Sequence, residues 1–179
     1  GGGVVLLPTE TFYGLGAFPE DPDAVQRVRD LKARPPELAL PVLCSDFQQV
    51  EDLVEVPASF RVRLSRSWPA ALTVILPARR FLPASSDGSL AVRIPAHPLL
   101  RALLYRVGPL TGTSANRHGE PPCTIADEAQ RSLNGAPDLV LDGGVTPGGQ
   151  ASTLVALTGG TDQVVRTGAF PWSSFQAVR

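Results

Sequence analysis

Side chains able to bind an anion occur at two places in this sequence, each at or near the end of an apolar or amphipathic segment. Lys32 and Arg34 follow one such segment, and Arg93 interrupts an apolar run that ends at Pro95. A buried charge without a partner is costly, so we expect Arg93 to face either an anionic ligand or a carboxylate. For Lys32 and Arg34 the alternatives are ligand binding and compensation of a helix dipole.

Two segments rich in hydroxyl groups and glycine also end apolar runs. The first is 8–16, Pro-Thr-Glu-Thr-Phe-Tyr-Gly-Leu-Gly, and the second is 109–116, Pro-Leu-Thr-Gly-Thr-Ser-Ala-Asn. Hydroxyls, an amide and exposed backbone N–H groups suit contacts to phosphate or a nucleotide. Each segment is equally consistent with an ordinary turn in which these side chains bind nearby backbone groups. Because 8–16 follows an expected buried strand, it should lie at a sheet edge where ligands bind.

Signatures of several common catalytic and metal sites are absent from the sequence. It has no Walker loop, dinucleotide-binding glycine motif, metalloprotease helix or nucleophile elbow. Cys44 and Cys123 lack the paired spacing of a zinc site. A hydrolase pair of Ser114 and His118 is disfavoured, because the glycine expected two residues after the serine is missing. We therefore predict no dedicated metal site.

The composition limits the classes of protein that remain. The chain has 179 residues, of which 43% are hydrophobic, and a net charge of −1. This is enough for one core, so we expect a single domain over residues 1–179. A near-neutral chain has no general attraction to nucleic acid or membrane, so any basic site must be local. No apolar run approaches the roughly 20 residues needed to cross a bilayer, and the unpaired cysteines favour a cytoplasmic location.

Strand and helix patterns alternate along the chain and predict an α/β fold. The last two expected strands, 152–155 and 163–168, should form a hairpin through a turn at 159–160, which makes the sheet mixed. Further strands are expected at 4–7, 40–44, 72–76, 90–95 and 138–141.

The expected helices have recognisable ends. Asp21 and Pro22 predict a helix start, and Pro35-Pro36 predicts its end. Thr124 is expected to cap another helix, which ends at 134–135. Three more helices are expected from about 45, over 59–67 and over 99–107.

The order of these segments resembles the YrdC-like family of threonylcarbamoyl-AMP synthases. The resemblance runs from about Val4 to Gly168, and it depends on seven motifs in order, each of them weak alone. They are Pro8-Thr9-Glu10-Thr11 with Tyr13-Gly14-Leu15-Gly16, Lys32-x-Arg34, Pro69 with Leu72-Thr73, Arg93-Ile94-Pro95, Thr113-Ser114-Ala115-Asn116, Ser152-Thr153 and Arg166-x-Gly168. The sequence departs from the family pattern at 37–40, at Ala70-Ala71 and at Ala156.

This resemblance implies a twisted mixed sheet with flanking helices around a basic cavity, and a stand-alone short form of the enzyme. The implied activity is that of a nucleotidyltransferase, which makes threonylcarbamoyl-adenylate and pyrophosphate from L-threonine, bicarbonate and ATP for the threonylcarbamoyladenosine modification of tRNA. It also implies Mg²⁺ with ATP, threonylcarbamoyltransferase partner proteins and a weak contact with tRNA. Membrane association is not implied.

The resemblance also assigns roles to individual residues. Lys32 and Arg34 would be catalytic, supplying fixed positive charge where the carbamate meets the α-phosphate. ATP contacts are implied for Arg93, Ser114, Asn116, Ser152 and Arg166, and threonine or bicarbonate contacts for Thr9, Thr11, Tyr13 and Thr153. Such a reaction needs few titrating groups, since a carbamate is already an anion; it needs positioning and charge compensation.

Two other classes remain as alternatives. A non-catalytic RNA-binding module of the same fold is disfavoured by the near-neutral charge and by an aromatic content of 6%. The carbamoyl-transfer domain of hydrogenase maturation proteins would be expected beside cysteine-rich and acylphosphatase regions, which this sequence does not contain.

Overall fold

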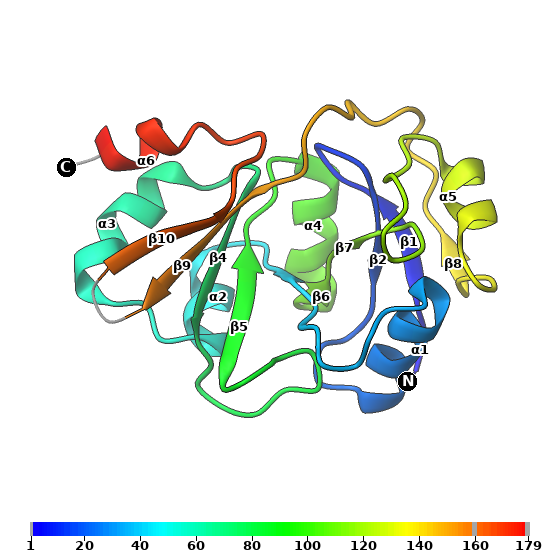
Figure 1. Cartoon of the computed structure of the whole chain (residues 1–179), viewed down its shortest axis with the longest axis horizontal. Helices are drawn as coiled ribbons and strands as arrows, with labels where there is room; N and C mark the ends of the chain where they lie inside the picture. Colours follow the sequence, from blue (N-terminus) through cyan, green and yellow to red (C-terminus); the bar gives the residue numbers. More distant parts are fainter. Residues whose placement is uncertain (1, 159–160, 178–179) are drawn as a thin grey trace.

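The computed structural model describes residues 2–158 and 161–177 (Figure 1). Its strands are β1 (Val5–Pro8), β2 (Tyr13–Gly16), β3 (Val42–Leu43), β4 (Leu72–Pro77), β5 (Ser89–Arg93), β6 (Leu110–Thr111), β7 (Thr113–Ser114), β8 (Leu139–Val140), β9 (Thr153–Thr158) and β10 (Thr161–Arg166). Its helices are α1 (Pro22–Lys32), α2 (Phe47–Leu53), α3 (Ala58–Ser67), α4 (Pro98–Val107), α5 (Ala126–Ser132) and α6 (Trp172–Ala177).

The strands form two mixed sheets. The smaller sheet has the order β7-β2-β1-β8, and the larger has the order β10-β9-β4-β5-β3-β6. Parallel pairs, such as β1 with β8 and β4 with β9, occur beside antiparallel pairs, such as β1 with β2 and β4 with β5. The expected α/β class and mixed strand directions are confirmed, with the strands divided between two sheets.

The segment 110–114 connects the two sheets. β6 pairs with β3 in the larger sheet, the chain then passes through Gly112, and β7 pairs with β2 in the smaller sheet. The two sheets are therefore held side by side by one continuous stretch of backbone. A small apolar cluster packs where they meet, and it consists of Leu7, Leu43, Leu100, Leu104 and Leu110.

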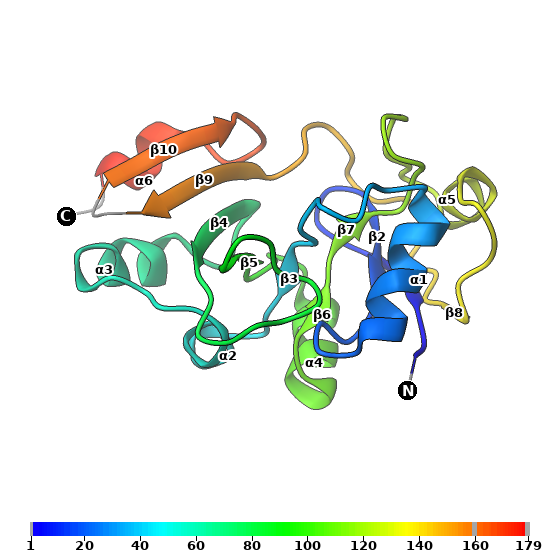
Figure 2. The same cartoon turned by 60° about the horizontal axis from the view of Figure 1, so that its bottom comes forward.

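The helices lie beside the sheets and cover the rest of the core. Figures 1 and 2 show α1 and α5 next to the smaller sheet, α2, α3 and α6 next to the larger sheet, and α4 between the two. On α1 an apolar stripe of Val25, Val28 and Leu31 is buried. No helix in the described part of the chain combines the length and apolar character required to span a membrane.

Helix α1 begins as the sequence predicts but ends earlier. The Asp21 carboxylate accepts hydrogen bonds from the backbone N–H groups of Asp23 and Ala24, as an N-cap does. The helix ends at Lys32, because Ala33 adopts a left-handed conformation with a φ of 47°. The prediction that Pro35-Pro36 ends this helix is therefore wrong.

Two other local predictions need correction. The segment 8–16 is not only a turn, because Tyr13–Gly16 pairs with Val5–Pro8 as an antiparallel hairpin. Thr124 does not cap α5; the helix starts at Ala126, and Thr124 instead accepts a backbone hydrogen bond from Thr146. Strands β9 and β10 do form the expected hairpin, while its predicted turn at 159–160 lies outside the described residues.

Candidate active site

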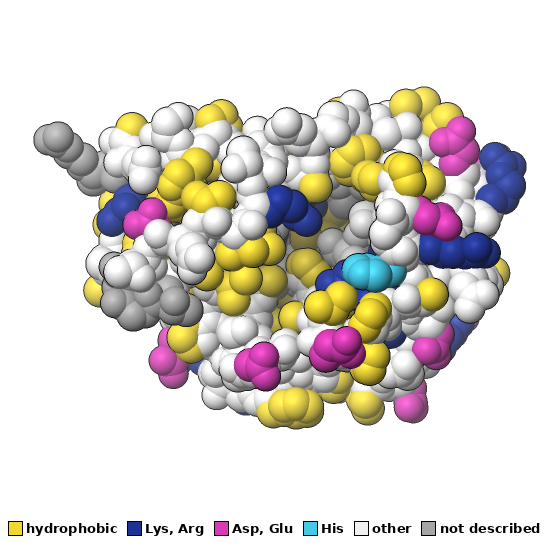
Figure 3. Space-filling view, viewed as in Figure 1, with side chains coloured by type: hydrophobic (Ala, Val, Ile, Leu, Met, Phe, Trp, Pro, Cys, Tyr) yellow, Lys and Arg dark blue, Asp and Glu magenta, His cyan; other side chains and the backbone are white. Residues whose placement is uncertain are grey.

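A cavity of about 350 Å³ lies between the two sheets. Figure 3 shows it as a hollow in the centre of one face, with Lys or Arg side chains at its edge. Its walls come from the β1–β2 hairpin, the segment after α1, strands β3, β4 and β5, the segment 112–114 and the β9–β10 hairpin. It brings together most of the side chains that the sequence predicts for a site, namely Thr9, Thr11, Tyr13, Arg34, Arg93, Ser114, Ser152 and Arg166.

Three arginines from different elements converge on this cavity. Arg34 follows α1, Arg93 ends β5 and Arg166 ends β10. No acidic residue lines the cavity within the described chain. Burial lowers the pKa of Arg93; the negative charge of Glu10 raises that pKa, and the positive charge of Arg166 lowers it. Burial also lowers the pKa of Arg34, and so does the positive charge of Arg29. The site therefore holds positive charge that an anion would stabilise.

The arginines keep hydrogen-bond donors for a ligand. Arg34 donates to the backbone oxygen of Ala39 at 2.9 Å, and Arg166 donates to that of Ser152 at 3.0 Å. The Nε atoms of Arg34 and Arg93 are buried and have no hydrogen-bond partner. Guanidinium groups with free donors are well suited to bidentate contacts with phosphate or carboxylate.

A β-bulge turns Arg166 toward the cavity. Val164 lies opposite Val155, but Arg166 lies opposite Leu154, so the bulge places Val165 as an extra residue in β10. Directly opposed residues of paired strands share one face of the sheet, and Leu154 lines the cavity. Regular pairing would place Arg166 opposite Thr153, which does not line the cavity. The bulge therefore determines which face carries the charge.

Two hydroxyl groups also line the part of the cavity that the larger sheet forms. The Oγ atoms of Thr73 on β4 and Ser152 before β9 are 2.8 Å apart, and both residues line the cavity. The sequence prediction included Ser152 and missed Thr73 as a site residue. The sequence does contain a clue to Thr73: it is the one hydroxyl in the otherwise apolar run 72–76, where packing alone favours an aliphatic side chain.

The hydroxyls of the β1–β2 hairpin are already engaged. The Thr9 hydroxyl donates to the backbone oxygen of Phe12 at 2.8 Å, and the hydroxyl oxygens of Thr9 and Thr11 are 3.1 Å apart, within hydrogen-bond distance. The Tyr13 hydroxyl contacts Asp142, Gly143 and Gly144. Burial raises the pKa of Tyr13, and so does the Asp142 carboxylate, against a lowering by the N–H of Gly143. Their predicted contacts with threonine or bicarbonate remain predictions.

Lys32 does not line the cavity. Its ammonium group donates to the backbone oxygen of Ser114 and, at 2.6 Å, to that of Asn116. It is 2% exposed, and burial, with a further effect of Arg34, lowers its pKa to about 8. Lys32 thus ties the end of α1 to the segment that carries Ser114, and its predicted catalytic role remains a prediction.

Asn116 and Thr153 also lie outside the cavity lining. The Asn116 amide donates to the backbone oxygens of Arg117 and Glu120. Thr153 donates to the oxygen of Phe170 and accepts from the N–H of Gly168. The structure thus uses both side chains to hold loops next to the cavity, and neither side chain lines it.

Two further observations bear on what the cavity binds. Within the described residues there is no group of three or more His, Cys, Asp or Glu side chains that could hold a metal ion. A second, more open groove of about 500 Å³ runs past Phe18 and Val107, and no cationic residue lines it. The cavity between the sheets is therefore the better candidate for an anionic ligand.

Comparisons with known proteins agree with this arrangement. A family model for the Sua5, YciO and YrdC proteins, described as telomere recombination, matches residues 1–168. The chain is 36% identical to the threonylcarbamoyl-AMP synthase of Bacillus subtilis, over 98% of this chain and 52% of that protein. It is 37% identical to the synthase of Pseudomonas paraeruginosa, over 92% and 90% of the two chains.

The fold also matches a solved structure. The crystal structure of Pyrococcus abyssi Sua5 complexed with L-threonine superposes with a TM-score of 0.92 at 34% identity, and the match covers 99% of this chain and 54% of that one. The chain spans about half the length of the Bacillus and Pyrococcus relatives. The family model covers nearly the whole sequence, and the resemblance to YrdC-like proteins is confirmed: the chain belongs to the Sua5/YciO/YrdC family.

Proposed function

We propose that this chain is a threonylcarbamoyl-AMP synthase. The observation that carries the proposal is the convergence of Arg34, Arg93 and Arg166 in one cavity, beside the hydroxyls of Thr73 and Ser152. Such a site can hold two anions against each other while offsetting their charge. Because the cavity takes its walls from both sheets, the proposal treats residues 1–179 as one domain.

The proposed reaction needs positioning more than acid–base chemistry. The threonine nitrogen forms a bond to the bicarbonate carbon, water leaves, and the product is a carbamate. A carbamate oxygen then attacks the α-phosphorus of ATP, the bond to the β-phosphate breaks, and pyrophosphate departs with the electron pair. Both reactants of the second step are anions, so fixed cations lower its barrier. The enzyme would be a nucleotidyltransferase.

The three arginines would divide this work. Arg93 and Arg166 both come from the larger sheet, at the ends of β5 and β10, and would hold the phosphate chain, with Ser152 beside Arg166. Arg34 lies on the other wall, after α1, and would hold the carboxylate or carbamate. Mg²⁺ would enter as part of the Mg²⁺–ATP substrate, since phosphates and water supply most of its ligands in such sites.

Pyrophosphate release tests the proposal. The purified chain, with Mg²⁺–ATP, should release pyrophosphate only when L-threonine and bicarbonate are both present, and mass spectrometry should detect threonylcarbamoyl-adenylate. Equal release without threonine would overturn the proposal. Carbamoyl phosphate replacing threonine would point to the hydrogenase-maturation type of domain. Salt-dependent tRNA binding without ATP turnover would point to an RNA-binding module.

The cellular context belongs to the same proposal. The product would pass to threonylcarbamoyltransferase partners that modify tRNA, and a weak contact with tRNA itself is part of the prediction. A cytoplasmic location also remains a prediction.

A further inference from the structure

Glu10 is a buried carboxylate that lacks hydrogen bonds. Both of its oxygen atoms are shielded from solvent and have no hydrogen-bond partner in the described structure. The nearest cation is Arg93, whose Nη1 atom is 3.7 Å from Oε1 of Glu10, beyond the range of a hydrogen bond. The two side chains are 15% and 6% exposed. They form an ion pair held by charge alone.

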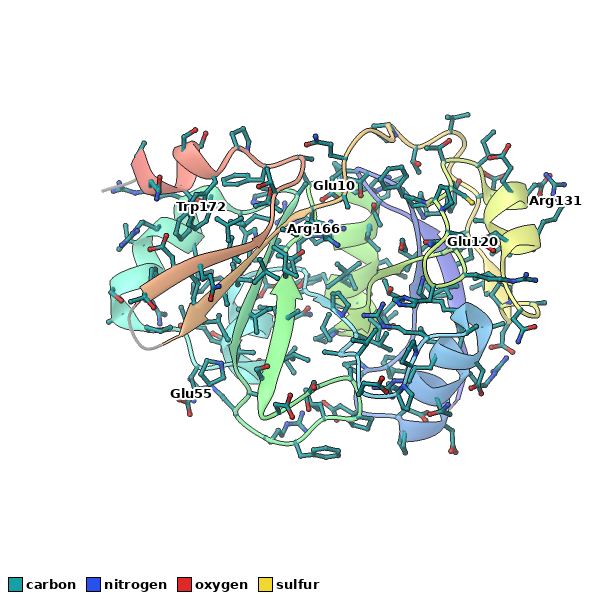
Figure 4. The ribbon with its side chains drawn as sticks, in the orientation of Figure 1. Glu10, Glu55, Glu120, Arg131, Arg166 and Trp172 are labelled. Atoms are coloured by element: carbon teal, nitrogen blue, oxygen red, sulfur yellow. The ribbon has the colours of Figure 1, made fainter. Side chains whose placement is uncertain are left out.

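Glu10 also acts on the charge of the cationic cavity, through Arg93. The charges of Glu10 and of Arg166 both act on Arg93, with opposite signs. Figure 4 labels both side chains in the middle of the view, Glu10 from the β1–β2 hairpin and Arg166 from β10. A negative charge at this place repels any phosphate that the arginines attract.

Because this repulsion weakens phosphate binding, it should serve a step other than the binding of ATP. A cavity that only had to hold phosphates would bind them more strongly with a neutral side chain at position 10. ATP binding requires the arginines to hold phosphates strongly, whereas pyrophosphate release requires them to hold phosphates weakly. The two requirements conflict because pyrophosphate carries the same negative charge through which the arginines bind ATP. Binding that is equally strong for substrate and product slows turnover at the release step.

We propose that Glu10 is a positioning residue that holds Arg93 in the cavity wall and weakens the binding of pyrophosphate, so that the product can leave. The inference rests on the proposed function only in naming pyrophosphate as the product. Because Arg93 makes no hydrogen bond to Glu10, its N–H groups can bind a phosphate without first breaking a hydrogen bond to that carboxylate. When the phosphate leaves, the Glu10 carboxylate again stabilises the Arg93 charge.

The test uses Glu10→Gln, which keeps the shape of the side chain and removes its charge. Calorimetry with inorganic pyrophosphate should show binding about tenfold tighter than in the unchanged chain, with and without Mg²⁺. Glu10→Asp, which keeps the charge, should stay near the original affinity. Glu55→Gln makes the same chemical change at an exposed position that Figure 4 places away from Glu10, and it should leave the affinity unchanged.

The outcomes separate the possibilities. Tighter pyrophosphate binding in Glu10→Gln, with a lower KM for ATP and a lower kcat, supports the inference; a merely structural role would not tighten binding. Unchanged or weaker pyrophosphate binding overturns it, and weakening only with Mg²⁺ would make Glu10 a metal ligand instead. Pyrophosphate binding is measured without turnover, so a chain that binds pyrophosphate and fails the threonine-dependent assay refutes the proposed function alone.

Discussion

Gly112 lies directly against Leu43 where the two sheets meet. A methyl group on Gly112 would be 2.2 Å from Cγ of Leu43 and 2.6 Å from both of its Cδ atoms. Real side chains do not approach so closely, so any larger residue at position 112 would force Leu43 or the backbone to shift. Both residues also line the cavity, which couples this contact to the site.

We expect Gly112→Ala to lower the free energy of unfolding by about 1–3 kcal/mol, because an extra carbon in a packed core forces its neighbours to move. Urea denaturation measures the change. The double variant with Leu43→Ala should lose less than the sum of the two single variants, since the smaller side chain makes room. Gly3→Ala, whose added carbon would be 3.8 Å from its nearest neighbour, is the control. Additive losses would contradict the contact.

Lys32 should give the protein a pH-dependent stability. Its pKa is about 8 in the folded chain, against an ordinary value of 10.5 that the unfolded chain should show. Between these values the unfolded chain binds a proton that the folded chain does not, so the free energy of unfolding should rise with pH across this window. The rise from this group should approach about 3 kcal/mol.

The variant Lys32→Met isolates that contribution. Tyr13 and other groups that titrate at high pH remain in both proteins, so the difference between the two pH profiles belongs to Lys32. The variant should also lose about 1–3 kcal/mol of stability, because the buried backbone oxygens of Ser114 and Asn116 lose their donor. Parallel pH profiles, measured by urea denaturation, would refute the buried ammonium.

Deleting Val164 and Val165 together should move Arg166 out of the cavity. Gln163 lies opposite Ala156, so without these two residues Arg166 would pair with Val155 and share the face of the sheet that points away from the cavity, whereas deleting Val165 alone would leave Arg166 opposite Leu154. We expect ATP binding, measured by calorimetry, to weaken at least as much as in Arg166→Ala, by about tenfold. Val165→Ala keeps the bulge and should bind ATP normally. Full ATP affinity in the variant that lacks both residues would show that the register of β10 does not place this charge.

These relationships mark where sequence reasoning succeeds and where it stops. Arg93 stands out because a charge in an apolar strand demands a partner, and the structure gives it both a cavity and Glu10. The Asp21 cap is also predictable, since it depends on neighbours in the sequence. In contrast, β6 and β7 have two residues each, and only pairing with distant strands defines them.

Side-chain direction is the second limit of the sequence. Lys32 and Arg34 are two residues apart, yet one is tied to the backbone behind Ser114 and the other lines the cavity. The left-handed conformation of Ala33 lies between them, and no pattern in the sequence predicts it. Likewise, the bulge that turns Arg166 is visible only from its pairing with β9.

Arg34 and Lys32 should therefore differ in what they affect. Among the described residues the Arg34 side chain makes one hydrogen bond, to the backbone oxygen of Ala39, so Arg34→Ala should keep its melting temperature. Threonine-dependent pyrophosphate release should fall by about 100-fold or more, as expected when a charge beside a developing anion is removed. Lys32→Ala should lose both activity and stability. Arg61→Ala is the control, because Arg61 pairs with Glu51 at the surface and should leave the rate unchanged. If Arg34→Ala releases pyrophosphate at the original rate, the cavity charge that supports the proposed function is not used in the reaction.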